Sequence, residues 1–122
     1  MQPRLSAQTE ELVRRMYEAF NKRDIGAALG FMHADVDWPN MLEGTRAHGH
    51  PEVRTYWERQ FAVIDPHVEP TGMTQSEDGQ VVVDVHQVIR HLDGTIRDDR
   101  TVRHVYTMRD GLVARMDVRA VD

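Results

Sequence analysis

The chain has 122 residues, of which 40% are hydrophobic and 29% charged, and its formal net charge at pH 7 is −5. These values are typical of one globular domain, which we expect to span residues 1–122. Cysteine is absent, which excludes disulfides, a thiolate nucleophile, a thiolate zinc site and an iron–sulfur cluster. The 15 basic residues are interspersed with 20 acidic ones, so we expect no binding to nucleic acid or to a membrane. Residues 1–9 lack the apolar centre of a signal peptide, and we expect a cytoplasmic protein.

The first half of the chain has helical periodicity. Apolar residues recur at three- and four-residue spacing over residues 6–21, which predicts an amphipathic helix. Asp24 is a favourable N-cap for a short second helix that would extend to Met32. A short strand is expected at residues 36–38, followed by a loop rich in glycine and proline. Pro51 suits the first turn of a third helix, which the sequence Asp65-Pro66 ends.

Beyond residue 67 the pattern changes to β-branched runs that are separated by short turns containing glycine. The expected strands are residues 68–75, 80–92, 96–108 and 112–121. The two central strands are long, so their sheet must twist strongly and curl. We therefore predict an α+β fold in which three N-terminal helices lie across the concave side of a strongly curved sheet. This arrangement leaves a conical pocket for a small, largely apolar molecule.

Four segments carry a resemblance to a known family. They are MYEAFNKRD at 16–24, HADVDW at 33–38, AHGHPEVRTYW at 47–57 and HVYTMRDGLVARMDV at 104–118. In this order they resemble the SnoaL-like branch of the nuclear transport factor 2 superfamily, which also contains ketosteroid isomerase. The resemblance implies a cystatin-like α+β roll with a mixed or antiparallel sheet. The scaffold hosts isomerases, polyketide cyclases, dehydratases, epoxide hydrolases and non-enzymatic binding domains, so it does not define one activity.

The catalytic pattern of ketosteroid isomerase is not retained in this match. That pattern has an aspartate base, with a tyrosine and a protonated aspartate as oxyanion donors. Matched by eye, the base falls near Asn40, the tyrosine near Met16 and the oxyanion aspartate near Arg103. All three residue types differ, so we do not expect steroid isomerisation.

Alternation along residues 81–92 defines two strand faces, of which one is richer in valine. Alternation alone places the valine-rich face in the core. The resemblance implies the opposite register, with Asp84, His86 and Val88 on the concave face and the valine face against a second subunit. An apolar face formed by Val83 and Val85 would be an aggregation hazard in water, so we expect a homodimer through the convex face.

The register implied by the resemblance also turns Asp99 and Arg103 inward, beside Asp84 and His86. A carboxylate next to an imidazole in a partly dry cavity suits proton transfer, and we rank His86 first as the catalytic group. Arg103 would hold a ligand carboxylate or a developing enolate. The alternative is an ion-pair network without chemistry. A one-residue bulge would turn the whole set outward.

The predicted cavity lining is apolar and aromatic, with one amide. It comprises Met16, Phe20, Trp38, Asn40, Trp57, Val88, Met116 and Val118. Large side chains of these types are equally suited to a plain core, so they favour a cavity without proving one.

His48 and His50 have a spacing that a metal could use, with Asp35, Asp37 or Glu52 as a possible third ligand. No second histidine cluster completes this set, and the motif leads directly into a helix. We predict no metal and no other cofactor.

Two classes of function remain open. The first is a cofactor-free enzyme of the isomerase, cyclase, dehydratase or hydrolase type, acting by acid–base chemistry on a small metabolite with a carbonyl or hydroxyl group. The second is a non-catalytic ligand-binding or accessory domain with the same cavity. A protein adaptor is a third class, for which the sequence offers no partner surface beyond the sheet face.

Overall fold

The structure is a computed structural model that describes residues 5–121. These residues form three helices and six strands. In chain order they are α1 (Ala7–Asn21), α2 (Ile25–Leu29), β1 (Met32–Asn40), β2 (Thr45–His48), α3 (Gly49–Val63), β3 (Asp65–Gln75), β4 (Val81–Arg90), β5 (Ile96–Arg109) and β6 (Leu112–Ala120).

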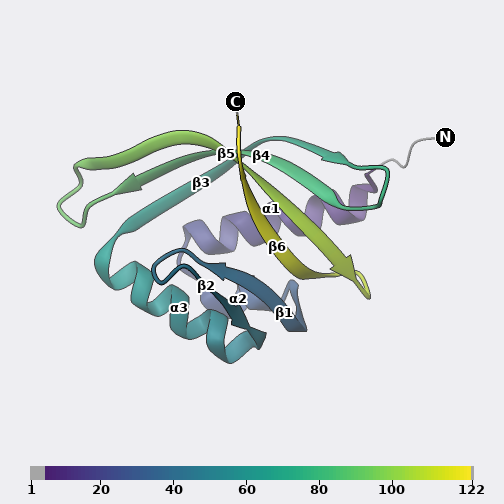
Figure 1. The fold of residues 1–122 in the computed structure, drawn as a ribbon, viewed down its shortest axis with the longest axis horizontal. Coiled ribbons are helices and arrows are strands. Elements are labelled where there is room, and N and C mark those ends of the chain that lie inside the picture. The colour runs from purple at the N-terminus through teal and green to yellow at the C-terminus, as the bar shows by residue number, and fades with distance from the viewer. Residues whose placement is uncertain (1–4, 122) are drawn as a thin grey trace.

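The six strands make one curved sheet in the order β2-β1-β6-β5-β4-β3. Only the β1–β6 pair among these is parallel, so the sheet is mixed. Figure 1 shows β3, β4 and β5 arching over the helices, with α1 crossing beneath the arch and α3 beside β1 and β2. The predicted α+β fold, with helices on the concave side of a curved sheet, is confirmed. The sheet does not close on itself.

The two N-terminal helices begin where the sequence predicts. Ser6 and Asp24 are their N-caps, and each side-chain oxygen accepts a hydrogen bond at 3.1 Å from the backbone N–H three residues later. The second helix is shorter than expected. It ends at Leu29 with Gly30 as its C-cap, and Met32 is the first residue of β1 instead of the last of the helix.

The segment expected to be a loop contains a strand. β1 extends well beyond residues 36–38, and β2 pairs with it as a hairpin. Asn40 closes the turn, because its Oδ1 accepts hydrogen bonds from the backbone N–H groups of Leu42 and Glu43. A hairpin this short has too few residues to show period-two alternation, which explains why the pattern missed it.

The faces of β4 follow simple alternation and not the register implied by the resemblance. Val81, Val83 and Val85 are buried under the helices, at 0–1% exposure. The expectation that this face is convex is wrong. The physical reason is that the helices need an apolar partner, and three consecutive inward valines provide it.

The convex face is correspondingly polar, and it carries cross-strand pairs between β4 and β5. Arg103 Nε donates to Asp84 Oδ1 at 2.9 Å, and His86 Nε2 contacts Asp99 Oδ1 at 2.6 Å. The apolar surface that motivated a dimer is therefore in the core, so that argument for dimerisation no longer holds. The dimer itself stays a prediction.

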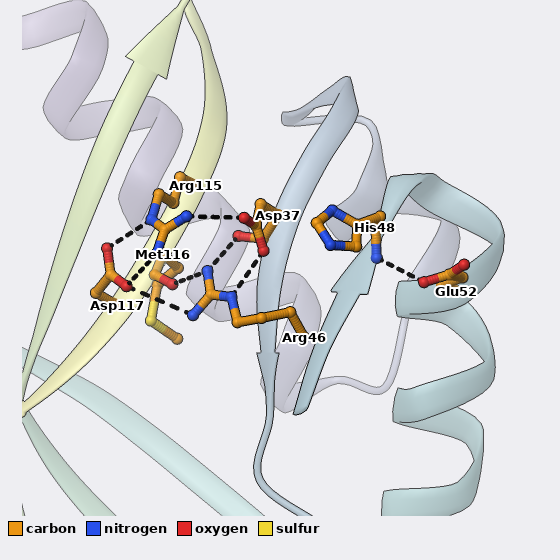
Figure 2. A network of polar contacts seen from close by, with 7 residues as sticks. All are labelled: Asp37, Arg46, His48, Glu52, Arg115, Met116 and Asp117. Carbon is orange, nitrogen blue, oxygen red and sulfur yellow. Dashed lines mark hydrogen bonds and ion pairs between the residues drawn. The ribbon is translucent and has the colours of Figure 1, made fainter. Parts of the chain in front are cut away.

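Arg46 on β2 connects neighbouring strands of the sheet where the pairing of the parallel strands β1 and β6 is irregular. Its guanidinium donates to Asp37 Oδ1 at 2.7 Å and to the Met116 carbonyl oxygen at 2.8 Å, so one side chain joins β1 and β6 (Figure 2). Arg115 Nη1 donates to Asp37 Oδ2 from the other side, and the Arg115 hydrogen bond lowers the pKa of the Asp117 carboxyl. The network fixes the wall of the sheet from which Trp38 projects.

Replacing Arg46 with methionine should lower the free energy of unfolding by about 1 to 3 kcal/mol, because it leaves Asp37 and a backbone carbonyl short of a donor in a half-buried site. Urea denaturation measures the change. The matched control is Arg15→Met, which removes a solvent-exposed pair with Glu11 and should leave the free energy of unfolding close to that of wild type. Equal losses of unfolding free energy in the two variants would show that the contacts of Arg46 do not stabilise the sheet.

Candidate functional site

A cavity of about 590 Å³ lies between the concave face of the sheet and helices α1 and α3. This volume is in the range of small-molecule sites. Aromatic rings form much of its wall: Trp57 meets Phe20 and Trp38 edge to face, each with ring centroids 5.5 Å apart. The other apolar side chains in the lining include Met16, Ile64, Val68, Ile89, Val102, Met116 and Val118. The wall therefore suits an apolar or aromatic molecule.

Three buried polar side chains form what we call the polar cluster: Tyr17, His104 and Tyr106. Tyr17 comes from α1, and the other two are neighbours on the concave face of β5, two residues apart. Tyr17 Oη lies 2.8 Å from His104 Nδ1, and Tyr106 Oη donates to Tyr17 Oη at 2.7 Å. All three side chains line the cavity.

Burial controls the protonation of the polar cluster. Desolvation lowers the pKa of His104 to about 4, so its imidazole is neutral at pH 7. Desolvation likewise raises the pKa of Tyr106 and of Tyr17 well above the ordinary tyrosine value. The cluster is therefore a set of neutral hydrogen-bonding groups.

The hydrogen-bond chain assigns the imidazole tautomer. Tyr17 has one O–H, and the unprotonated Nδ1 of His104 is the acceptor that this buried hydroxyl faces. The proton of the neutral ring is then on Nε2. Within residues 5–121 no side-chain or backbone group hydrogen-bonds Nε2. Every side-chain nitrogen or oxygen of these residues that is fully buried has a hydrogen-bond partner, so Nε2, which has none, is not fully buried. His104 Nε2–H is thus a donor that is open to the cavity.

A second polar point on the wall is Tyr56 on α3. Its hydroxyl accepts hydrogen bonds from Gln60 Nε2 at 3.0 Å and from the Met41 backbone N–H at 3.2 Å. Burial raises the pKa of Tyr56. The contact with Met41 fastens the β1–β2 turn beside the cavity.

The mouth of the cavity is charged. Its lining includes three exposed arginines, Arg97, Arg100 and Arg119, and one half-buried carboxylate, Asp98. We call the three the mouth arginines. Arg100 Nε donates to Asp98 Oδ2 at 2.8 Å. The mouth thus differs in charge from the neutral polar cluster.

Most of the residues predicted to line the cavity do line it. They are Met16, Phe20, Trp38, Trp57, Met116 and Val118. Two do not: Asn40 lies at the β1–β2 turn, and Val88 lies on the convex face of β4, opposite Asp99. Ligand binding by these six side chains stays a prediction.

The four predicted catalytic residues, Asp84, His86, Asp99 and Arg103, are outside the cavity. Their expected inward orientation is wrong. Asp84 and Arg103 are 43% and 41% exposed, and His86 and Asp99 are 47% and 50% exposed. They form two cross-strand pairs on the convex face, where solvent screens them. The structure places the four residues next to one another, as expected, but on the convex face of the sheet and not on the concave face.

The sequence did contain a signal for His104, although the register that turns Asp99 and Arg103 inward places His104 on the opposite face of the strand. Once Val81, Val83 and Val85 are placed inward, the antiparallel partner strand has to follow the same alternation. The register pairs Val81 with Tyr106 and Val83 with His104. The apolar alternation of β4, carried across the ladder, therefore locates the cavity side of β5.

The histidines considered for a metal have other partners. The His48 backbone N–H donates to Glu52 Oε1 at 2.8 Å, visible in Figure 2, and His50 Nε2 lies 3.0 Å from the Met32 carbonyl oxygen. Asp37 is held by arginines. Residues 5–121 contain no group of three or more metal-ligating side chains. The absence of a bound metal stays a prediction.

Within the same residues, every helix is too short or too polar to cross a membrane.

Comparison with known proteins gives the chain a family. TerC, a protein crystallised with polyporic acid, has 27% identity and a TM-score of 0.81, covering 94% of this chain and 92% of its own. An NTF2-like protein of unknown function from Burkholderia pseudomallei has 23% identity and a TM-score of 0.81, covering 95% and 92%. An LEH-like epoxide hydrolase from M. tuberculosis has 14% identity and a TM-score of 0.76, covering 93% and 82%.

The last two similarities show the fold alone. No match was found among curated proteins. The SnoaL-like domain family matches residues 13–116, which is most of the chain. The resemblance noted in the sequence is confirmed, and this chain belongs to the SnoaL-like domain family.

Proposed function

We propose that the cavity binds a small, largely apolar molecule with a carbonyl or hydroxyl oxygen, and that the protein is a cofactor-free enzyme that activates this oxygen. One observation carries the proposal: His104 lines the aromatic cavity, its Nδ1 is engaged by Tyr17, and its Nε2 has no protein partner within residues 5–121. A preorganised donor in a site that excludes water stabilises charge that develops on an oxygen. Membership of the SnoaL-like family and the ligand crystallised with TerC support a small-molecule role.

The polar cluster acts as a donor and not as a proton source. If His104 released its Nε2 proton, Nδ1 would have to take one from Tyr17, and burial raises the pKa of that tyrosine. Full proton transfer is therefore costly. A hydrogen bond from Nε2–H to a carbonyl oxygen needs no such transfer, and a neutral imidazole can polarise a carbonyl in this way. Tyr106 strengthens the donor by hydrogen-bonding Tyr17.

The polar cluster supplies donors for an oxygen, but the site lacks the base that steroid isomerisation needs. The isomerase tyrosine and oxyanion aspartate matched Met16 and Arg103 by eye, and the cavity instead contains Tyr17 and His104, one residue further along in each case. The matched base position, Asn40, has no carboxylate and lies outside the cavity. Hydrogen-bond donors are thus present one residue from the two matched donor positions, while the matched base position lacks a carboxylate.

A specific observation favours the second candidate, a non-catalytic binding domain. Asp98 is the one carboxylate among the described lining residues. It is six residues from His104 along β5, or roughly 20 Å at strand spacing, too far to reach a proton next to a carbonyl held by His104. An enzyme with this site needs a substrate whose C–H is acidic enough for water or a group of the substrate itself to remove the proton.

The carbonyl probe 2-acetylnaphthalene tests the donor. Bound to the wild-type protein, its C=O stretch should move to lower wavenumber in the infrared spectrum, and in His104→Phe the shift should disappear and the affinity fall by about two- to tenfold. Tyr17→Phe should give a smaller shift, because it removes the group that orients the ring. His86→Gln on the convex face is the matched control and should behave like wild type. An unchanged stretch in His104→Phe would remove His104 from the site.

Deuterium exchange separates an enzyme from a binding domain. If His104 activates the carbonyl, the acidic methylene protons of bound methyl 3-(naphthalen-2-yl)-3-oxopropanoate, which water can remove, exchange with D2O faster than in buffer, and His104→Phe abolishes the acceleration. If the probe binds with a shifted stretch but exchanges at the rate in buffer, the binding domain is the correct description.

A further inference from the structure

The mouth arginines differ from most arginines of this protein. Elsewhere in residues 5–121 an arginine side chain is usually held by a carboxylate, as in the pairs on α1 and at the β1–β6 junction. Arg97 and Arg119, in contrast, make no ion pair or side-chain hydrogen bond within the described residues, although Arg119 is near enough to Asp117 to help lower the pKa of that carboxyl. Two guanidinium groups at the cavity are thus available to a ligand.

The balance of charge at the mouth is positive in a chain that is negative as a whole. Three arginines and one aspartate line this part of the cavity, while the formal net charge of the chain is −5. Because Arg100 already pairs with Asp98, the excess positive charge is on Arg97 and Arg119. Guanidinium groups bind carboxylates and other planar anions through paired N–H donors.

The two ends of the cavity are connected along β5. His104, Val102 and Arg100 alternate on its concave face, and the Cα atoms of His104 and Arg100 are about 13 Å apart at strand spacing. An arginine side chain reaches several ångströms back along this line. A ligand with the length of two fused rings and polar groups at opposite ends can therefore contact both.

We propose that the ligand class of this cavity is an elongated aromatic acid: one end has a neutral carbonyl or hydroxyl oxygen at His104, the rings lie among the tryptophans, and the other end has an anionic group at the mouth arginines. The inference rests on the proposed function and makes it more specific. The anion is at the mouth because the groups around His104 are neutral and buried, and an unpaired charge there would be costly to desolvate. At the mouth, solvent and guanidinium groups both stabilise it.

A matched pair of probes tests the charge. The acid is 6-hydroxy-2-naphthoate and the neutral probe is its methyl ester, each titrated calorimetrically into the full-length protein. Wild type should bind the acid more tightly, and the preference should shrink at high NaCl concentration. The double variant Arg97→Gln/Arg119→Gln should weaken binding of the acid by about two- to twentyfold and leave the ester within about twofold. Asp98→Asn should strengthen binding of the acid.

The control is Arg14→Gln/Arg15→Gln on the outer side of α1, which changes net charge equally and should change neither affinity. Equal affinity for acid and ester in wild type, with no effect of the mouth substitution, would overturn the proposed ligand charge. The proposed function would survive that result if His104→Phe still weakened binding of the ester. If neither probe binds at all, both proposals are wrong.

Discussion

Replacing Trp57 with alanine should lower the free energy of unfolding by about 3 to 5 kcal/mol. Trp57 is 2% exposed, and it packs against Phe20 and Trp38 at the junction of α3, α1 and the sheet. The substitution removes one of the two buried tryptophans of the core, and the rigid rings around it cannot collapse into the space. Urea denaturation followed by circular dichroism measures the loss.

The matched control for Trp57→Ala is Leu92→Ala. Leu92 is also large and apolar, but it is 64% exposed, so its removal should cost no more than about 0.5 kcal/mol. A cost below about 1 kcal/mol for Trp57→Ala would mean that the aromatic wall is not a packed part of the core. The same variant should also lose affinity for naphthalene probes, because one wall of the cavity is gone.

Acidification should destabilise the protein through His104. The pKa of His104 is lowered to about 4 in the native state, from 6.5 in the unfolded chain. Between these values the unfolded state binds a proton that the native state does not, so stability rises with pH. The contribution is fully present above pH 6.5 and is lost as the pH falls to about 4, a loss of about 3 kcal/mol.

Urea denaturation of wild type and His104→Phe across this pH range measures the effect as the difference between the two pH profiles. His86→Gln is the control and should keep the wild-type profile, because its convex-face position leaves His104 unchanged. Nuclear magnetic resonance gives an independent check if the phenylalanine variant does not fold: the His104 ring signals should not titrate above about pH 5. A His104 midpoint near 6.5 would contradict the buried neutral imidazole on which the proposed function depends.

The elements of the fold were predictable because their signals are local. Helix α1 has an N-cap at Ser6 and a regular apolar stripe, and the strands of the second half are bounded by turns containing glycine. Strand β2 was not predictable, because four residues show no periodicity and form a strand only by pairing with β1. Most of the apolar lining was also predictable, since large apolar side chains on inward helix faces have few other places to go.

The orientation predicted for the catalytic candidates was wrong because the strand register implied by the resemblance was wrong. A shift of one residue exchanges the two faces of a strand, and both faces of β4 contain valines, so the resemblance led us to the face with Asp84 and His86. Periodicity read by itself pointed to the correct face.

By itself, the sequence determined the α+β class, the helix starts and an apolar interior, because these depend on spacing along the chain. Only the tertiary structure decided which side of the sheet the helices cover, because that choice depends on how all strands share one apolar face. It also joined Tyr17 to His104 across 87 positions of sequence. No local pattern reports that a histidine at this distance will lose water, stay neutral and face a cavity.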